Sequence, residues 1–251
     1  MKGKLVLLVV VLLIVAMIPA LAMAKSQAKP EKIGSYVLDR SKPVLPQIGL
    51  PLKPGAPAAP VSNAPAALGI QPRAVQALVN ESFEGVWPNG NWAVYDFGAA
   101  GAQWGAEPFQ PRRGQYAAWV AGDGVNAQDP TVSPVYLDGM DTWMDYPLDL
   151  SNATKGTVRF QYKNDAEFGY DFFSWCVSAD GGGNFYCQYH TGSTNNTWRL
   201  VVINLNNVPG YGSMLGESDV IVTWGFTSDM SYVARGAIVD VVHIRATGPN
   251  N

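Results

Sequence analysis

The chain has little of what hydrolytic enzymes use, with two cysteines, two histidines and 15% charged residues among 251. His-Glu-x-x-His and Gly-x-Ser-x-Gly motifs are both missing, so a zinc hydrolase or a serine hydrolase would lack its usual signature. A run of basic residues is missing too, and the whole chain has a net charge of −3. These absences argue against catalysis, against nucleic acid and against anionic membrane surfaces as partners.

Aromatic residues are nearly absent from the first third of the chain. Tyr36 is the only Phe, Trp or Tyr before residue 80, although the chain contains 9 Phe, 8 Trp and 11 Tyr. Aromatic side chains supply large buried areas, so we predict that residues 80–251 form the folded domain. A segment of about 170 residues is enough for one domain with an ample core, and too short for two.

The N-terminus has the pattern of a secretory signal peptide. Lysines at positions 2 and 4 precede the apolar run Leu5–Ala16, and Pro19 and the small-residue site Ala22-Met23-Ala24 follow. This order predicts a signal peptide over residues 1–24, cleaved after Ala24, which would leave a net charge of about −5. The alternative is a retained membrane anchor, because about 20 apolar residues can span a bilayer.

Residues 25–79 are rich in proline and alanine and hold nine of the 18 prolines. Such a composition buries too little apolar surface to offset the entropy of ordering the chain. We therefore predict a disordered, semi-extended spacer, or else a leader without a role, with a short helix near residues 66–79.

Short runs of alternating apolar and polar residues dominate the region after residue 80. Gly, Pro and Asn separate these runs, and no helical period persists for three turns. The fold class expected from this pattern is all-β, an antiparallel β-sandwich, most simply a jelly roll. The expected strands are 81–85, 91–97, 115–120, 141–146, 157–162, 170–178, 184–190, 198–203, 220–226 and 236–245.

The two cysteines flank a turn signal. Cys176 and Cys187 lie on either side of Asp180-Gly181-Gly182-Gly183, and a two-residue loop at Gly181-Gly182 would place them directly opposite each other. Secretion permits oxidation, so we predict a cross-strand disulfide. That loop would make the cysteines a hydrogen-bonded pair, the less favourable position for a bridge.

Three segments resemble a known family. Residues 81–92, ESFEGVWPNGNW, are similar to the opening strand and loop of bacterial secreted MAM-like (concanavalin-like) jelly rolls, found beside immune-inhibitor-A-type metallopeptidases and in cell-surface proteins. Residues 170–182 resemble the central hairpin of that family, and 236–241 its closing strand. The resemblance implies a jelly roll over residues 80–246, without the accompanying peptidase domain.

The resemblance also implies a structural calcium site. Related jelly rolls hold the ion where the first strand meets the last, and Glu84 and Asp240 match the two acidic positions. Val241 stands where family members often carry a second acid, which weakens the match. The alternative is that Glu84 is a surface acid and that Asp240 caps a loop or pairs with an arginine.

Aromatic and acidic residues give further candidates. Trp87 and Trp104 fall in Gly/Pro-rich segments and are the candidate sugar-stacking residues. Asp141 and Asp145 share one face of a strand with Trp143, and we interpret them as solvated strand-edge acids rather than as catalytic residues. His190 and His243 are expected to be partly exposed, and Arg112-Arg113 forms an internal salt bridge or meets an acidic ligand.

Together these patterns predict a secreted, non-catalytic β-sandwich that recognises an extracellular polysaccharide or protein. The competing classes are a hydrolase, a peptidase-accessory domain and a structural envelope protein. The sequence does not indicate an oligomeric state.

Overall fold

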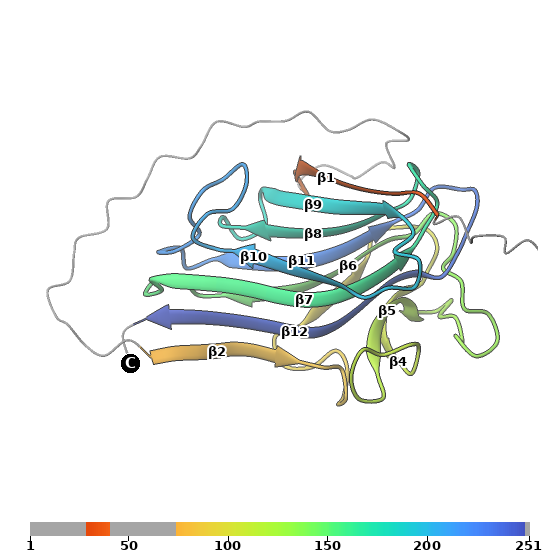
Figure 1. The fold of residues 1–251 in the computed structure, drawn as a ribbon, viewed down its shortest axis with the longest axis horizontal. Helices are drawn as coiled ribbons and strands as arrows, with labels where there is room; N and C mark the ends of the chain where they lie inside the picture. Colours follow the sequence, from red (N-terminus) through yellow and green to blue (C-terminus); the bar gives the residue numbers. More distant parts are fainter. Residues whose placement is uncertain (1–28, 41–73, 249–251) are drawn as a thin grey trace, which may run out of the picture.

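The computed structural model describes residues 29–40 and 74–248. The predicted signal peptide, and residues 41–73 of the predicted spacer, lie outside these ranges. Within them the chain forms twelve strands and no helix, so no membrane-crossing helix is found there (Figure 1). The strands are β1 (Glu31–Leu38), β2 (Ala74–Glu81), β3 (Ala93–Asp96), β4 (Gln103–Glu107), β5 (Ala117–Asp123), β6 (Asp141–Leu148), β7 (Lys155–Asp165), β8 (Phe172–Ser178), β9 (Phe185–Gly192), β10 (Arg199–Asn204), β11 (Val220–Thr227) and β12 (Gly236–Gly248).

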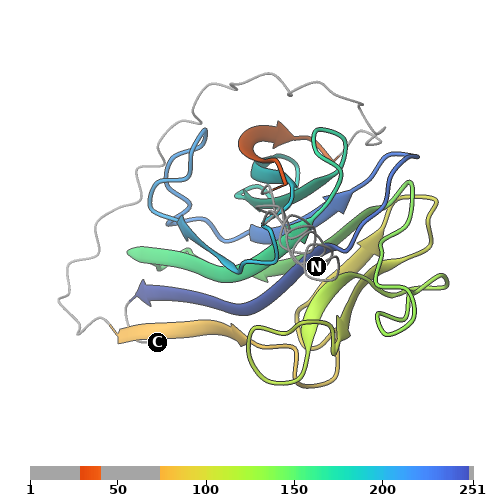
Figure 2. The ribbon, with the colours of Figure 1, turned by 45° about the vertical axis from the view of Figure 1, so that its right-hand side comes forward.

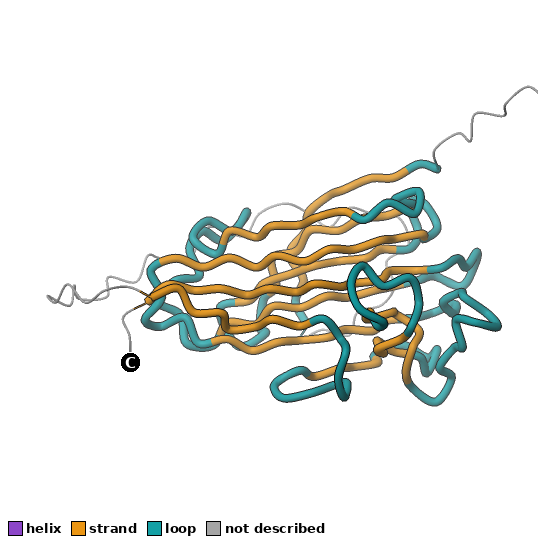
Figure 3. The backbone as a smooth tube through the Cα atoms, turned by 60° about the horizontal axis from the view of Figure 1, so that its bottom comes forward, coloured by secondary structure: helices purple, strands orange, loops and turns teal. Residues whose placement is uncertain are grey.

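The strands form two antiparallel sheets packed face to face, which confirms the predicted β-sandwich with jelly-roll architecture. Sheet I has the order β1-β9-β8-β11-β6-β3. Sheet II has the order β10-β7-β12-β5-β4, and β2 pairs with β12. Figure 1 shows β10, β7, β12 and β2 side by side, and Figure 3 shows only strands and connecting loops.

The core between the sheets is aromatic, as the sequence indicated. Inward-facing residues alternate with outward-facing ones along each strand, as in β7, where Val158, Phe160 and Tyr162 are at most 1% exposed. The ring centroids of Phe160 and Trp224 lie 5.5 Å apart, edge to face. Such pairs add about 0.5–1.5 kcal/mol to the hydrophobic contribution of the area they bury.

The N-terminal boundary of the domain differs from the prediction. β1 and β2 both arise from residues assigned to the spacer, and the expected helix near residues 66–79 is replaced by β2 from Ala74 onward. β1 extends sheet I along β9, with Glu31 opposite Gly192 and Leu38 opposite Phe185. Backbone hydrogen bonds to an existing edge strand order these segments, which composition alone cannot indicate.

The predicted disulfide joins β8 to β9. Cys176 and Cys187 are directly opposite in the antiparallel register and are bonded. Their Cα atoms are 4.0 Å apart, a separation typical of the close, non-hydrogen-bonded pair rather than of the wider pair that a two-residue loop implies. The turn between these strands is longer than two residues, which accounts for the difference.

β12 changes partners midway. Ile238 and Val239 pair with β5, whereas the residues from Val242 onward pair with β2. The register with β7 shifts between Asp240 and His243, and Val241 at this bulge has φ 55°. A β-branched residue in this left-handed region is strained, and bulges of this kind redirect neighbouring side chains. The bulge lies in the site described next.

Candidate functional site

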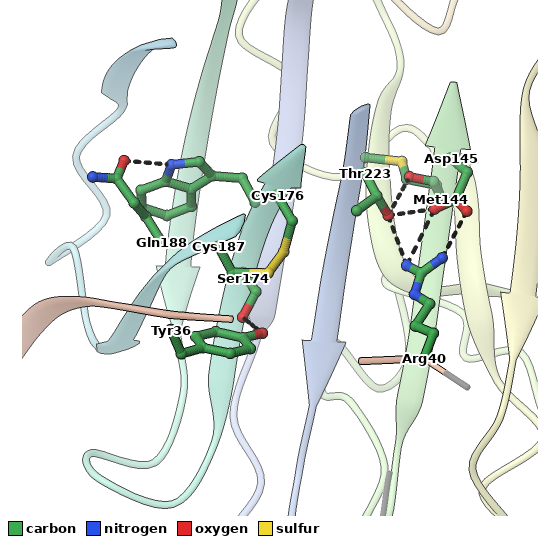
Figure 4. The surroundings of a disulfide bond; sticks show 10 residues. Tyr36, Arg40, Met144, Asp145, Ser174, Cys176, Cys187, Gln188 and Thr223 are labelled. Atoms are coloured by element: carbon green, nitrogen blue, oxygen red, sulfur yellow. Dashed lines mark hydrogen bonds and ion pairs between the residues drawn. A yellow bond between two sulfur atoms is a disulfide. The ribbon is translucent and has the colours of Figure 1, made fainter. Parts of the chain in front are cut away.

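The N-terminal arm, residues 29–40, forms the edge strand β1 of sheet I, and its last described residue, Arg40, lies on the outer face of that sheet. Arg40 reaches from the end of β1 to β6, where its guanidinium donates to Asp145 at 2.7 and 3.2 Å and to Thr223 at 2.9 Å (Figure 4). The guanidinium also lies 4.5 Å from the ring centre of Trp143 and 4.3 Å from that of Phe185. These contacts place the end of the arm on the outer face of sheet I.

Two acids on this face, which the sequence placed in solvent, are buried. Asp141 and Asp145 share one face of β6 with Trp143, as predicted, but they are 8% and 7% exposed. Burial raises the pKa of Asp141, while a 2.6 Å hydrogen bond from the Trp143 indole opposes the rise. The interpretation of these acids as solvated is therefore wrong, because alternation along a strand does not show what covers its face.

The outer face of sheet II carries a groove with a volume of about 260 Å³. We call it the arginine groove. The residues that line it are Arg112, Arg113, Arg159, Gln161, Leu200, Val241, His243 and Arg245. They come from the loop before β5 and from β7, β10 and β12, three strands that run side by side in Figure 2 as in Figure 1. Among the described residues, the lining contains no carboxylate.

Antiparallel register brings these side chains together. Arg159 of β7 lies directly opposite His243 of β12, and Arg245 follows two residues later on the same face. Val158 and Ile244 point the other way and are fully buried. Strand periodicity therefore presents the polar set outward while the apolar set fills the core.

The groove arginines form no ion pair with a carboxylate of the described residues. In the described part of the chain, ion pairs join Lys29 to Asp165, Arg40 to Asp145, and Arg199 to Glu31, and no groove arginine takes part. The one side-chain hydrogen bond of Arg112, 2.8 Å from Nε to the Gln161 amide oxygen, orients the guanidinium without compensating its charge. Among the described residues the groove therefore gathers positive charge without ion pairs, while the Asp240 carboxylate lies behind the loop that carries Arg112 and Arg113.

The pKa of His243 also reflects the positive charge gathered in the groove. Burial lowers the pKa of His243, and the positive charges of Arg245, Arg159 and Arg113 lower it further. Three guanidiniums from three segments thus act on one imidazole. By contrast, His190, which was expected to be partly exposed, is fully buried and bonded to Asn164 and Glu31.

Two carboxylates hold the loop that carries Arg112 and Arg113. Asp240 is fully buried and accepts the backbone N–H groups of both arginines, at 2.7 and 2.9 Å, and also that of Val241 at 2.6 Å. Glu84 accepts the N–H groups of Gln115 and Tyr116 at 2.9 and 3.0 Å. We call these two carboxylates the loop clamp.

Unusual backbone conformations surround the loop clamp. Gly114 has φ 65° and lies so close to the Glu84 carboxylate that a Cβ there would overlap it. Phe83, Gln110 and Val241 also have positive φ, between 51° and 60°. Strained residues of this kind collect where a structure must hold a particular geometry. Here that geometry is the position of the arginine loop.

The loop clamp coincides with the expected calcium position. Glu84 and Asp240 lie close enough for the charge of Glu84 to add to the burial that raises the pKa of Asp240. This pair fits a calcium ion in charge, but calcium takes six to eight oxygens and three of the four carboxylate oxygens here accept N–H groups. The described residues contain no cluster of three or more acidic, histidine or cysteine ligands. The side chains alone therefore do not fit the ion.

The two tryptophans selected as sugar-stacking candidates lie elsewhere. Trp104 is in β4 rather than in a loop, is fully buried, and donates its indole N–H to the Thr142 carbonyl, so it cannot be a surface platform. Trp87 is half-buried, with ring centroids 4.8 Å from Phe83 and 5.0 Å from Trp92. A ligand contact by Trp87 stays a prediction.

The sequence shows the residues that line the groove but does not show that they lie together in space. Arg159 and Arg245 occupy outward positions of predicted strands, and Arg112-Arg113 was a candidate for an acidic ligand. No basic stripe is visible along the chain because the arginines are far apart in sequence. Pairing between β7 and β12 brings them together, and a single sequence does not specify that pairing.

Comparisons with known proteins identify no family. No family model and no curated protein matches the chain. Solved structures with a similar arrangement include the K1 cleaved adhesin domain of Lys-gingipain from Porphyromonas gingivalis, with TM-score 0.45 and 17% identity over 70% of this chain and 99% of that one. A family 11 carbohydrate-binding module of a cellulosomal cellulase from Clostridium thermocellum matches with TM-score 0.39 and 16% identity, over 70% and 95% of the two chains. Function does not transfer from one fold to another at this level of similarity.

Proposed function

We propose that this protein is an extracellular, non-catalytic recognition module that binds carbohydrate in the arginine groove. The observation that carries the proposal is an open groove on a sheet face, lined by guanidinium, imidazole and amide groups and free of carboxylates. Such a lining can donate hydrogen bonds to a ligand but has no acid/base pair for hydrolysis. The clamped loop fixes half of the arginines before a ligand arrives, which lowers the entropic cost of binding.

The test is a polysaccharide array probed with the full secreted chain, with release of reducing ends measured in parallel. We expect retention on a subset of polysaccharides and no turnover. Steady multiple-turnover release of reducing ends that is lost in Asp141→Asn would instead make the protein a hydrolase.

The extracellular location is part of the same proposal. The disulfide between Cys176 and Cys187 is typical of an oxidising compartment. Cleavage after Ala24 and membership of the MAM-like jelly rolls remain proposals. N-terminal sequencing of the exported protein should begin at Lys25, and retention of residues 1–24 would indicate a membrane anchor instead.

Calcium at the loop clamp also remains a proposal. Glu84 Oε2 accepts no N–H from the described residues, so an ion there would need backbone carbonyls to complete its shell. A ligand that binds only the native state raises the unfolding midpoint. If calcium binds there, the midpoint should rise in calcium and fall in chelator, and an unchanged midpoint with no metal by elemental analysis would remove calcium.

A further inference from the structure

We infer that the ligand of the arginine groove is an acidic polysaccharide, a chain whose sugars carry carboxylate or sulfate groups. This inference rests on the proposed function and narrows it to one substrate class. Four of the eight arginines of the chain meet in this groove, all four exposed, in a protein whose net charge is −3. The four positive charges repel one another, although the protein as a whole is negatively charged. An anionic ligand bound between them removes that repulsion.

The chemistry of the groove suits oxyanions. Guanidinium groups present a planar fork of donors that matches carboxylate and sulfate geometry, and charge-assisted hydrogen bonds are about twice as strong as neutral ones. Arg113, Arg159 and Arg245 are exposed and form no ion pair with the described residues. Arg112 is oriented by Gln161.

The groove is too small to enclose a drug-sized molecule, and its lining comes from a loop and three strands of the sheet face. Its volume of about 260 Å³ lies below the ~300–1,000 Å³ of pockets that enclose a small ligand. Leu200, 55% exposed, and Val241 supply apolar contacts for the C–H faces of sugar rings. No Phe, Trp or Tyr of the described residues lines the groove, so we assign recognition to charge rather than to stacking on such rings.

The deciding experiment uses calorimetric titration of the full secreted chain with three oligosaccharides. These are oligogalacturonate, which carries carboxylates, a dextran sulfate oligosaccharide, and an uncharged galactan oligosaccharide. The test variant is Arg159→Gln/Arg245→Gln, which removes two exposed charges from the groove. The matched control is Arg199→Gln/Arg235→Gln, which removes two exposed charges outside the groove lining.

We expect the wild type to bind at least one acidic oligosaccharide and to bind the galactan at least tenfold more weakly. Because each arginine contributes about tenfold through charge-assisted hydrogen bonds, the groove variant should lose about 100-fold in affinity. The control variant should stay within about twofold of the wild type, because its two arginines do not line the groove and exposed charges are screened by salt. The two acidic probes then show whether carboxylate or sulfate is preferred.

Other outcomes separate the two proposals. Equal affinity for galactan would overturn the acidic preference and leave carbohydrate recognition in place. Equal affinity for polyglutamate or duplex DNA would overturn carbohydrate recognition as well, and so would no binding to any oligosaccharide. An equal loss in the control variant would contradict the groove as the site.

Discussion

Replacing Arg40 by alanine is expected to lower the free energy of unfolding by about 3–5 kcal/mol, the cost of breaking a buried ion pair. The Arg40 and Asp145 side chains are only 14% and 9% exposed. The substitution leaves the Asp145 carboxylate buried with no cation and removes the guanidinium from between Trp143 and Phe185. Chemical denaturation should show the loss, and the thermal midpoint should fall by about 10 °C.

Arg199→Ala is the matched control. Its ion pair with Glu31 has a similar distance, 2.7 Å, but both side chains are about 40% exposed, so the loss should stay below about 1 kcal/mol. In addition, Arg40→Ala/Asp145→Ala should recover part of the stability lost in Arg40→Ala. Equal losses in the free energy of unfolding for Arg40→Ala and Arg199→Ala would show that the Arg40–Asp145 ion pair is not buried as described.

Replacing Asp240 by alanine is expected to reduce stability and ligand binding together. The change leaves three backbone N–H groups without their carboxylate acceptor, and hydrogen bonds to charged groups contribute about 1.5–3 kcal/mol each, though not additively. We expect a loss of about 3 kcal/mol or more. Because the same carboxylate holds Arg112 and Arg113, affinity for acidic oligosaccharide should also fall by about tenfold or more.

Asp149→Ala is the control and should change neither the free energy of unfolding nor the affinity for acidic oligosaccharide. In the described residues, the Asp149 carboxylate accepts a hydrogen bond from the nearby Ser151 N–H and none from the arginine loop. Calorimetry and denaturation on both variants provide the comparison. Adding chelator to the wild type separates the loop clamp from a metal site, since the clamp should persist without metal. Unchanged affinity in Asp240→Ala would mean that the clamped loop does not contribute to the ligand site.

The sequence predicts the positions of many strands and the register of one strand pair, β8 with β9. The alternating run Thr157–Tyr162 lies inside β7, and the glycine turn fixed the pairing of Cys176 with Cys187. These features depend on local periodicity and turn chemistry, which neighbouring residues determine. β4 was missed because its five residues, Gln103–Glu107, include a glycine and fit no clear alternation.

The arm and the burial of Trp104 depend on contacts far apart in sequence. Arg40 and Asp145 are separated by 105 residues, and composition assigned Arg40 to a spacer. Trp104 lies in a Gly-rich segment, which predicts a loop, yet it packs against Phe173 with ring centroids 6.1 Å apart. Tertiary packing overrides local preference at both positions.

Glu84 and Asp240 show a partial success. The resemblance to MAM-like jelly rolls put both acids where the first strand meets the last; in the structure they lie close together, but Glu84 is in the loop after β2 rather than in a strand. Their contacts with four backbone N–H groups of the arginine loop, however, give them a role in positioning that loop. The sequence identified where the acids are but not which groups they hold.

The arginine groove as ligand site is tested most directly by NMR of the arginine side-chain Nε–H groups during titration with oligogalacturonate. Arg40, held between Trp143 and Phe185 on the other sheet, serves as an internal reference. The Nε–H signals of Arg159 and Arg245 are predicted to shift in proportion to occupancy while that of Arg40 stays unchanged. A shift confined to Arg40, or saturable binding without any change at Arg159 and Arg245, would contradict the assignment.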